Sequence, residues 1–596
     1  MVKNDIFNEI VSDKLNPLDN GGYEWQGRVY DTLRLITEKQ LYDTTLWKLF
    51  INQFSYDSDD VDNGWRGEFW GKMMRGACLI YNVTNDKKLY SILEDAVNGL
   101  LKEQDDLGRI CCYSVEREFH YWDMWGRKYV MLGLEYFYDI CDNAALKKAI
   151  VNALIPHADY IIKKVGRGEN QTPINETSND WFGLNSSSIL EPFVRLYKMT
   201  GERRFLDFSA YIVSEGGMSK DNIFERAYEG KLYPYEYPAT KAYEMMSCFE
   251  GLLEYYRVTG EEKWKTAVLN FINLVAKSEI TIIGSAGFTH ELFDNSAKKQ
   301  FLKNESGIMQ ETCVTVTWMK LCYQALRLTG ESKYASYIEH SAFNAMLGSV
   351  NSEGCPENGG MIFDSYSPIF MQKRGCGIGG IRILNLFNYY GCCAAIAAAG
   401  IGIMGMFPVM KTENSLVFNS YLPGEVESDG VRLDIKTNYP ADGIVQITAL
   451  KGNADLSLRI PEFSKETYLF VNGKAVACTS GEYANIKLND GDKLQLIIDC
   501  SVRIVYPSDY GENNEKVNMY GLAAGPLTLA RDSRFEDGVE CAEQLPSEIR
   551  RTTAVFEHQV AYELYCGDKK IKVVDYASAG KKWDMDSLVT AWIPKK

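Results

Sequence analysis

Two short clusters of thiol and carboxyl groups carry the strongest chemical signal in the sequence. Glu311 and Cys313 form the first cluster, and Cys392 and Cys393 form the second. Each cluster begins a segment with the pattern of a helix, where free backbone N–H groups lower the pKa of a thiol and favour the thiolate. Three thiolates and one carboxylate are a ligand set that suits tetrahedral Zn²⁺. The alternative is that the three cysteines are small buried hydrophobic residues.

A further carboxylate, Glu291, lies in the connection just before the predicted Glu311 helix, in the segment GFTHELFD. Hydrolysis of a glycosidic bond needs an acid/base together with a nucleophile or second base. A connection at the starts of the inner helices of a helical ring would direct Glu291 towards a central pocket. The alternative is an ordinary solvated loop carboxylate.

Several aromatic side chains could stack on sugar rings. The alternative is that they pack in the hydrophobic core, as aromatic residues commonly do. Candidates for substrate contact are Trp122 and Trp125 in HYWDMWGRKY, Trp181 in NDWFGLN, and His290 beside Glu291.

Other kinds of chemistry have little support. The sequence has five histidines, and no two have a spacing typical of a metal site, so a histidine-rich metal centre or a Ser-His-Asp triad is not indicated. The 64 Lys and Arg against 80 Asp and Glu give a net charge of −16. Such a surface repels phosphate backbones and anionic lipid, so neither nucleic acid nor a membrane surface is an expected partner.

The N-terminal segment contains no apolar stretch of signal-peptide length, and the odd number of cysteines, 15, argues against a disulfide framework. We therefore expect a cytoplasmic protein. The segment 383–410 contains no charged residue, but it is rich in Ala and Gly rather than Leu. We interpret it as a fully buried helix rather than a membrane span.

A weak repeat organises the first two thirds of the chain. It places a helix end, a polar turn with Gly or Asn and an acidic residue around Thr84, Thr200, Thr259 and Thr329. This pattern predicts helical hairpins, and about six of them favour a closed (α/α)6 toroid over residues 1–410, with an open solenoid as the alternative.

After Met410 the pattern changes to short alternating runs separated by Gly, Asn and Asp. These runs predict β-strands joined by hairpin turns. The expected organisation is a multidomain α + β protein, with the toroid followed by a β-sandwich over 411–505 and a second β-sandwich or C-terminal β domain over 506–596.

With these features the chain resembles glycoside hydrolase family 127, whose known members include β-L-arabinofuranosidases. The resemblance rests on Glu311-x-Cys313, Cys392-Cys393, Glu291 and Gly71-Lys72. In the C-terminal half it continues through LRIP (458–461), VNG (471–473), GEY (481–483), GD (491–492) and GPL (525–527).

The resemblance implies zinc on Glu311, Cys313, Cys392 and Cys393, with Cys392 as the nucleophile and Glu291 as the general acid/base. It implies a retaining exo-glycosidase that acts on oligosaccharides. One departure is Ala394-Ala395-Ile396, where the family typically has Pro-Pro-Asn after its cysteine pair. The expected partner is an oligosaccharide substrate, and a homodimer is left open.

Two rival functions remain at this point. One is a two-carboxylate glycosidase or polysaccharide lyase on the same toroid, without a metal and with the cysteines as packing residues. The other is a non-catalytic carbohydrate-binding protein with a structural zinc.

Overall fold

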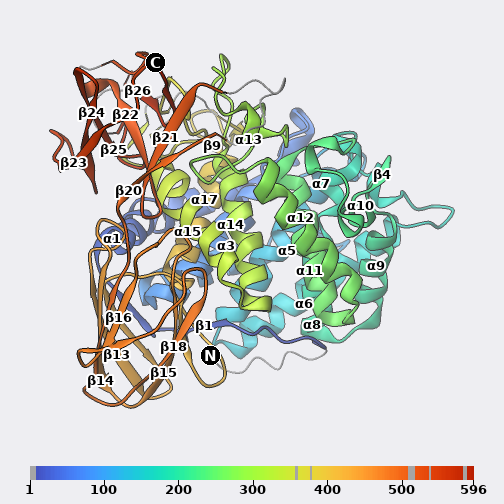
Figure 1. Ribbon diagram of the computed structural model, residues 1–596. Helices are drawn as coiled ribbons and strands as arrows, with labels where there is room; N and C mark the ends of the chain where they lie inside the picture. The colour runs from blue at the N-terminus through green and yellow to red at the C-terminus, as the bar shows by residue number, and fades with distance from the viewer. Residues whose placement is uncertain (1–8, 356–359, 376–378, 508–516, 536–537, 582–586) are drawn as a thin grey trace. The chain divides into compact units, whose positions relative to one another are not determined.

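The computed structural model describes residues 9–355, 360–375, 379–507, 517–535, 538–581 and 587–596. The chain divides into two compact units. Of the described residues, the first unit contains 9–12, 35–275 and 380–402, and the second contains those within 13–34, 276–379 and 403–596. Figure 1 shows helices in the N-terminal part of the chain and strands in the C-terminal part, which confirms the predicted α + β class.

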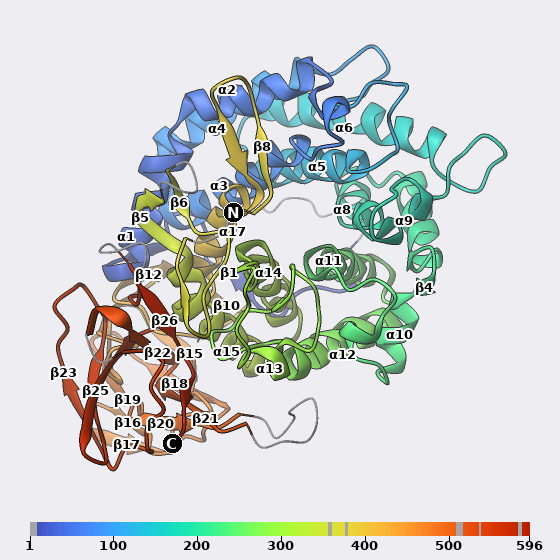
Figure 2. The ribbon, with the colours of Figure 1, turned by 90° about the horizontal axis from the view of Figure 1, so that it is seen from above.

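Four helical hairpins make up most of the first unit. They are α3 (Gly67–Thr84) with α4 (Lys87–Leu101), α5 (Asp123–Ile140) with α6 (Ala144–Lys164), α8 (Leu190–Thr200) with α9 (Arg203–Ser214), and α11 (Ala242–Thr259) with α12 (Glu262–Ser278). Figure 2 shows α3, α5, α8 and α11 following one another along an arc, with their hairpin partners on its outer side. Shorter helices α2 (Thr44–Asn52), α7 (Leu184–Ser187) and α10 (Ile223–Glu229) complete the unit, and α17 (Cys392–Met406) begins in it.

The second unit contains a fifth hairpin, α14 (Thr312–Thr329) with α15 (Ser332–Ser341), and the short helices α13 (Ser296–Lys299) and α16 (Leu347–Ser349). Helix α1 (Gly27–Ile36) begins in this unit. The closed toroid stays a prediction.

The predicted repeat marks the helix ends correctly, and the structure shows its chemistry. Helices α3, α8, α11 and α14 end at Thr84, Thr200, Thr259 and Thr329, and the next residue has a left-handed backbone. Each threonine hydroxyl donates a hydrogen bond to the carbonyl four residues earlier. In the three Thr-Gly-Glu copies the hydroxyl also accepts the N–H of the glutamate. One side chain thus closes one helix and fixes the start of the next.

Among the described residues, the three largest sheets lie in the second unit. A five-stranded sheet has the order β1 (Asn16–Pro17), β10 (Val409–Lys411), β11 (Leu416–Phe418), β15 (Ala454–Arg459) and β18 (Tyr483–Leu488). A seven-stranded sheet has the order β17 (Lys474–Val476), β16 (Tyr468–Val471), β19 (Lys493–Ile497), β14 (Ile444–Lys451), β13 (Val431–Thr437), β12 (Gly424–Ser428) and β2 (Tyr23–Trp25).

The third, nine-stranded sheet has a main path of β20 (Val502–Val505), β21 (Met519–Ala524), β22 (Leu527–Asp532), β25 (Lys569–Asp575), β24 (Ala561–Cys566) and β23 (Glu548–Thr552). Joined to it are β7 (Gln372–Lys373), β26 (Leu588–Thr590) and β27 (Ile593–Pro594). Three two-stranded ribbons pair β3 (Gly217–Met218) with β4 (Asp221–Asn222), β5 (Val350–Cys355) with β6 (Met361–Phe363), and β8 (Ile381–Ile383) with β9 (Tyr389–Gly391). The sandwich packing and the boundaries 1–410, 411–505 and 506–596 stay predictions.

The five-stranded and seven-stranded sheets each include a strand from the N-terminal end of the chain, β1 and β2. The sequence pattern did not indicate these strands. Pro17 in β1 pairs with Met410 in β10, and Trp25 in β2 pairs with Gly424 in β12. The indole N–H of Trp25 also donates to the carbonyl of Gly405 at 2.7 Å.

The prediction of a fully buried helix over 383–410 is correct only for its middle part, α17. The segment begins in the ribbon of β8 and β9, where Ile383, Leu386 and Phe387 are 65%, 92% and 90% exposed, and it ends in β10. The helix itself is buried. Its residues from Cys392 to Ala399 are at most 9% exposed. Helix α17 packs directly on α3, because a Cβ added at Gly76 would lie 2.7 Å from the Cβ of Ala398. In the part of the chain that the structure describes, none of the helices combines the length and the apolar character needed to cross a membrane.

The close crossing of α3 and α5 depends on a glycine, and this gives a first prediction. A Cβ at Gly71 would lie 1.8 Å from the carbonyl oxygen of Tyr129, whereas the nearest neighbour of a Cβ at Gly126 is 3.6 Å away. Gly71→Ala is therefore expected to destabilise the fold by about 1–3 kcal/mol or more, because the helices must separate. Gly126→Ala, also in this helix pair, should be neutral or stabilising by about 0.5–1 kcal/mol. Thermal unfolding of both variants measures the difference, and equal melting temperatures would contradict the close crossing.

Candidate functional site

Helix α14 begins directly after Glu311. Glu311 is the N-cap residue and Cys313 lies in the first turn, and they are 2% and 0% exposed. The N–H of Thr312 donates to the carbonyl of Ser365 at 2.9 Å, and its hydroxyl donates to the carbonyl of Asp364 at 2.6 Å. The first turn of α14 is therefore fixed by the segment that follows β6.

Helix α17 begins at Cys392, so both cysteine clusters lie at helix starts as predicted. The N–H of Cys392 donates to the carbonyl of Gly380 at 3.2 Å. Gly380 has a left-handed backbone, and a Cβ there would lie 2.1 Å from the Cys392 sulfur, so this residue must be glycine. Cys392 is 9% exposed and Cys393 is 0% exposed.

The four residues of the predicted metal set form one buried group. One ligand atom from each of Glu311, Cys313, Cys392 and Cys393 lies within 4.8 Å of the others. The sulfurs of Cys392 and Cys393 are 3.9 Å apart. In a tetrahedral site with Zn–S bonds of about 2.3 Å, two sulfurs are about 3.8 Å apart. The donor set and this separation fit a zinc ion, so the four residues could hold one.

The loop that carries Glu291 is held by hydrogen bonds from its backbone N–H groups to two buried side chains. The buried carboxylate of Glu279 accepts the N–H groups of Asp294, Asn295 and Ser296 at 3.0–3.1 Å. Burial raises the pKa of Glu279 to about 7, although these N–H groups favour the charged form. The Ser296 hydroxyl accepts the N–H groups of residues 287 and 288, both at 3.0 Å.

Glu291 itself has an unusual backbone. Both His290 and Glu291 have positive φ, 48° and 66°, a conformation that non-glycine residues adopt only when surrounding contacts impose it. The N–H of His290 donates to the carbonyl of Ile308 at 3.1 Å. The hydroxyl of Tyr366 donates to Oε1 of Glu291 at 2.7 Å. Glu291 is partly exposed and His290 is exposed.

A series of aromatic rings extends from the Cys392 side of the first unit. The indole N–H of Trp65 donates to the carbonyl of Gly380 at 3.1 Å, which links Trp65 to the residue that covers the Cys392 sulfur. Trp122 meets Trp65 edge to face with ring centroids 5.7 Å apart, and Trp125 meets Trp122 at 5.8 Å. Trp122 is partly exposed, whereas Trp125 is 1% exposed. Sugar contact by either ring stays a prediction.

Trp181 lies on a separate turn of the same unit. It is 36% exposed, has a φ of 52°, and lies with its ring 5.6 Å from the ammonium group of Lys241. The amide of Asn185 donates to the carbonyl of Tyr121 at 3.0 Å, which ties the helix after Trp181 to the loop before Trp122. An exposed ring on a strained turn is compatible with the predicted substrate contact.

Glu68 is a buried carboxylate near Cys392 that the sequence did not indicate. It accepts a hydrogen bond from Lys72 at 2.9 Å and another from the indole N–H of Trp125. Burial raises the pKa of Glu68 to about 7 against the opposing charge of Lys72, and Cys392 adds to the rise. The spacing of four residues between Glu68 and Lys72 on one helix is the signal that could have identified the pair.

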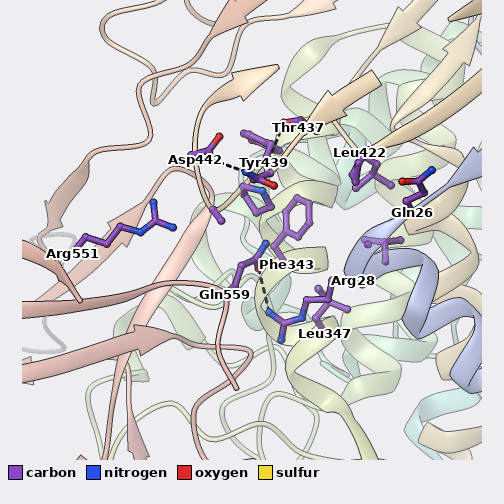
Figure 3. A pocket seen from close by; sticks show the side chains of 16 residues that line it. Gln26, Arg28, Phe343, Leu347, Leu422, Thr437, Tyr439, Asp442, Arg551 and Gln559 are labelled. Carbon is purple, nitrogen blue, oxygen red and sulfur yellow. Dashed lines mark hydrogen bonds between the residues drawn. The ribbon is translucent and has the colours of Figure 1, made fainter. Parts of the chain in front are cut away.

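The second unit also contains a cavity away from the predicted site residues. Figure 3 shows this cavity of about 310 Å³, with Phe343, Leu347 and Tyr439 on its apolar side and Arg28 and Arg551 among its polar groups. Arg28 is held there by hydrogen bonds of 3.2 Å to Gln559 and to Asp575. None of the predicted catalytic or metal-binding residues is among the residues that line it.

Two models of known protein families match this chain. A family model described as the GH127 catalytic domain of beta-L-arabinofuranosidase matches residues 28–363, which is more than half of the chain. A second model, described as the GH127 middle domain, matches residues 415–500. These matches place the chain among the glycoside hydrolases. Within them, it belongs to the GH127 beta-L-arabinofuranosidase family.

Individual relatives are distant in sequence. A non-reducing end beta-L-arabinofuranosidase of Bifidobacterium longum is 22% identical over 391 residues, which are 59% of this chain and 56% of the relative. The match thus spans a little over half of that protein's length.

Solved structures match over nearly the whole chain and show the same fold. A GH127 beta-L-arabinofuranosidase from Geobacillus stearothermophilus has a TM-score of 0.70 and 18% identity, with 98% of this chain and 100% of that chain covered. A GH127 beta-arabinofuranosidase has a TM-score of 0.76 and 17% identity, with 98% of each chain covered.

The anchoring of the Glu291 loop gives a second prediction. Ser296→Ala removes the acceptor of two buried N–H groups, which should cost about 1–3 kcal/mol and speed amide hydrogen exchange at residues 287–296. Ser209→Ala is the matched control, because that buried hydroxyl donates only within its own helix, to Phe205 at 2.8 Å. Exchange followed by mass spectrometry measures both. Unchanged exchange across 287–296 in Ser296→Ala would show that Ser296 does not hold the loop.

Proposed function

We propose that this protein is a zinc-dependent, retaining exo-glycosidase that removes β-L-arabinofuranosyl groups from the non-reducing ends of oligosaccharides. The observation that carries the proposal is the buried group of Glu311, Cys313, Cys392 and Cys393 in a chain of the GH127 family. The sugar is taken from the activity named for the Bifidobacterium relative. A cytoplasmic location and a homodimer remain predictions.

Glu311, Cys313, Cys392 and Cys393 would hold the zinc ion. Bound there, zinc would supply a Lewis acid that keeps the sulfur ligands as thiolates and makes sulfur a better leaving group. Its charge would also offset four anionic ligands that share one buried volume.

Cys392 is the proposed nucleophile. It is the more exposed cysteine of its pair, at 9% against 0% for Cys393. Successive residues at a helix start project about 100° apart, so two neighbouring sulfurs can share a metal while one faces substrate. The Cys392 sulfur attacks the anomeric carbon and forms a covalent glycosyl-enzyme as the glycosidic bond breaks.

Glu291 is the proposed acid/base. It first protonates the oxygen of the leaving group, and it then takes a proton from the water that attacks the anomeric carbon. The C–S bond breaks in this second step and its electron pair returns to sulfur. Two inversions at the same carbon give net retention of configuration.

The zinc ligands give a third prediction. The purified wild type should contain one zinc ion per chain by elemental analysis, and Cys313→Ala should lose most of it together with thermal stability, because metal binding is coupled to folding. Cys322→Ala is the matched control, since this second buried cysteine of α14 is not part of the ligand group. Equal zinc content in the two variants, or full activity in zinc-free protein, would favour a metal-free two-carboxylate mechanism.

The catalytic residues give a fourth prediction. Wild type should release the aryl group from an aryl β-L-arabinofuranoside, and NMR of the first product should show the β configuration. A mechanism-based β-L-arabinofuranosyl inactivator should label the peptide that contains Cys392. Glu291→Gln should lower kcat/KM for an unactivated arabinoside by about 10²–10⁴-fold, the usual contribution of acid/base catalysis.

Glu305→Gln is the control for this experiment, because it changes an exposed carboxylate in the same connection. A label on Cys393 or Glu311 would show that the nucleophile is assigned wrongly. Absence of hydrolysis across a panel of aryl furanosides and pyranosides would favour a carbohydrate-binding protein.

A further inference from the structure

Tyr366 connects two parts of the candidate site in the second unit. Its hydroxyl donates to Oε1 of Glu291 at 2.7 Å, across 75 residues of sequence. Its backbone pairs with Glu311 in an isolated antiparallel bridge. One residue thus contacts the proposed acid/base through its side chain and a proposed metal ligand through its main chain.

The backbone of Tyr366 is fixed relative to the start of α14. The two residues before it accept hydrogen bonds from the N–H and the hydroxyl of Thr312, at 2.9 and 2.6 Å. The N–H of Asp364 donates to the carbonyl of Ser349 at 2.7 Å. These bonds fix the two residues before Tyr366 against the turn that presents Glu311 and Cys313, so the backbone from which the Tyr366 ring projects is set by that turn.

The ring of Tyr366 has little room to move. Tyr366 is 7% exposed, and a Cβ at Gly379 would lie 2.5 Å from its hydroxyl oxygen. The hydroxyl is therefore confined to the region where it meets Glu291. By contrast, Glu279 and Ser296 hold the loop of Glu291 through its backbone and do not contact the Glu291 carboxyl in these hydrogen bonds.

We propose that Tyr366 is a positioning residue, which fixes the Glu291 carboxyl relative to the helix start that bears Glu311 and Cys313. The inference rests on the proposed function. A hydroxyl that donates to Oε1 orients the whole carboxyl group. The proton moves from the Glu291 carboxyl to the glycosidic oxygen as the C–O bond breaks and the S–C bond forms. Water later returns a proton to the carboxylate as it attacks the anomeric carbon and the C–S bond breaks. Tyr366 neither gains nor loses a proton.

This role predicts a dependence on the leaving group, which is the fifth prediction. Tyr366→Phe should lower kcat/KM about 10–100-fold for an arabinose disaccharide, whose leaving group must be protonated, because small displacements of a catalytic group are costly. For a dinitrophenyl arabinofuranoside, which departs without a proton, the loss should be less than about threefold. Glu291→Gln should show the same pattern with a larger loss. Zinc content should stay at the wild-type value in Tyr366→Phe.

Tyr256→Phe is the matched control, because it removes a tyrosine–glutamate hydrogen bond of 2.6 Å to Glu262, between α11 and α12. It should leave the ratio of the two kcat/KM values unchanged. If Tyr366→Phe fails to fold, Gly379→Ala provides the second variant, since its Cβ would displace the Tyr366 ring and should produce the same selective loss.

The outcomes separate this inference from the proposed function. An equal loss for both substrates, or no loss for the disaccharide, overturns the positioning role while wild-type hydrolysis and the Glu291→Gln pattern still support the glycosidase. If wild type cleaves neither substrate, both proposals fail.

Discussion

Four ligand atoms that can all carry negative charge lie within 4.8 Å of one another and are buried. Carboxylates and thiolates this close repel strongly in a medium of low dielectric constant. Such a group is stable only if protons or a cation neutralise it. In the first unit, the ammonium group of Lys72 bonds to the carboxylate of Glu68 at 2.9 Å. At Cys392 the backbone of Gly380 lies against the sulfur, where a Cβ would approach it to 2.1 Å, so only glycine leaves the sulfur room at this position.

The loops that carry the other candidate residues are strained. Tyr121, Trp181, His290 and Glu291 all have positive φ without being glycine. Each such residue costs about 1–3 kcal/mol and persists only where other contacts impose it. For the Glu291 loop these contacts can be identified: Glu279 accepts three N–H groups of the loop. The favourable contacts of the fold thus offset the strain of backbone conformations that the local sequence does not favour.

Local chemistry explains what could be predicted from the sequence. The helix ends at Thr200, Thr259 and Thr329 follow from a hydroxyl, a glycine and a glutamate that are adjacent in sequence. Each half of the ligand group lies within three residues at a helix start, and it was the family resemblance that predicted that the two halves come together. The contact between Tyr366 and Glu291 was not predictable, because these residues are 75 apart in sequence, and neither was the contact of Glu68 with Trp125, which is 57 residues away. Only the folded chain brings such pairs together. Strands of two and three residues, such as β1 and β2, are likewise too short to show alternation.

The pairing of β1 with β10 also has a consequence for synthesis on the ribosome. Pro17 leaves the ribosome long before Met410, its partner in the sheet. At bacterial-type elongation rates of about 5–20 residues per second, roughly 20–80 s separate the two. Until then the N-terminal strands have no sheet to join, while the helical hairpins, whose contacts are local, can already fold. The five- and seven-stranded sheets can therefore be completed only late in translation, and the nascent chain must keep its first strands from pairing with other molecules until that time.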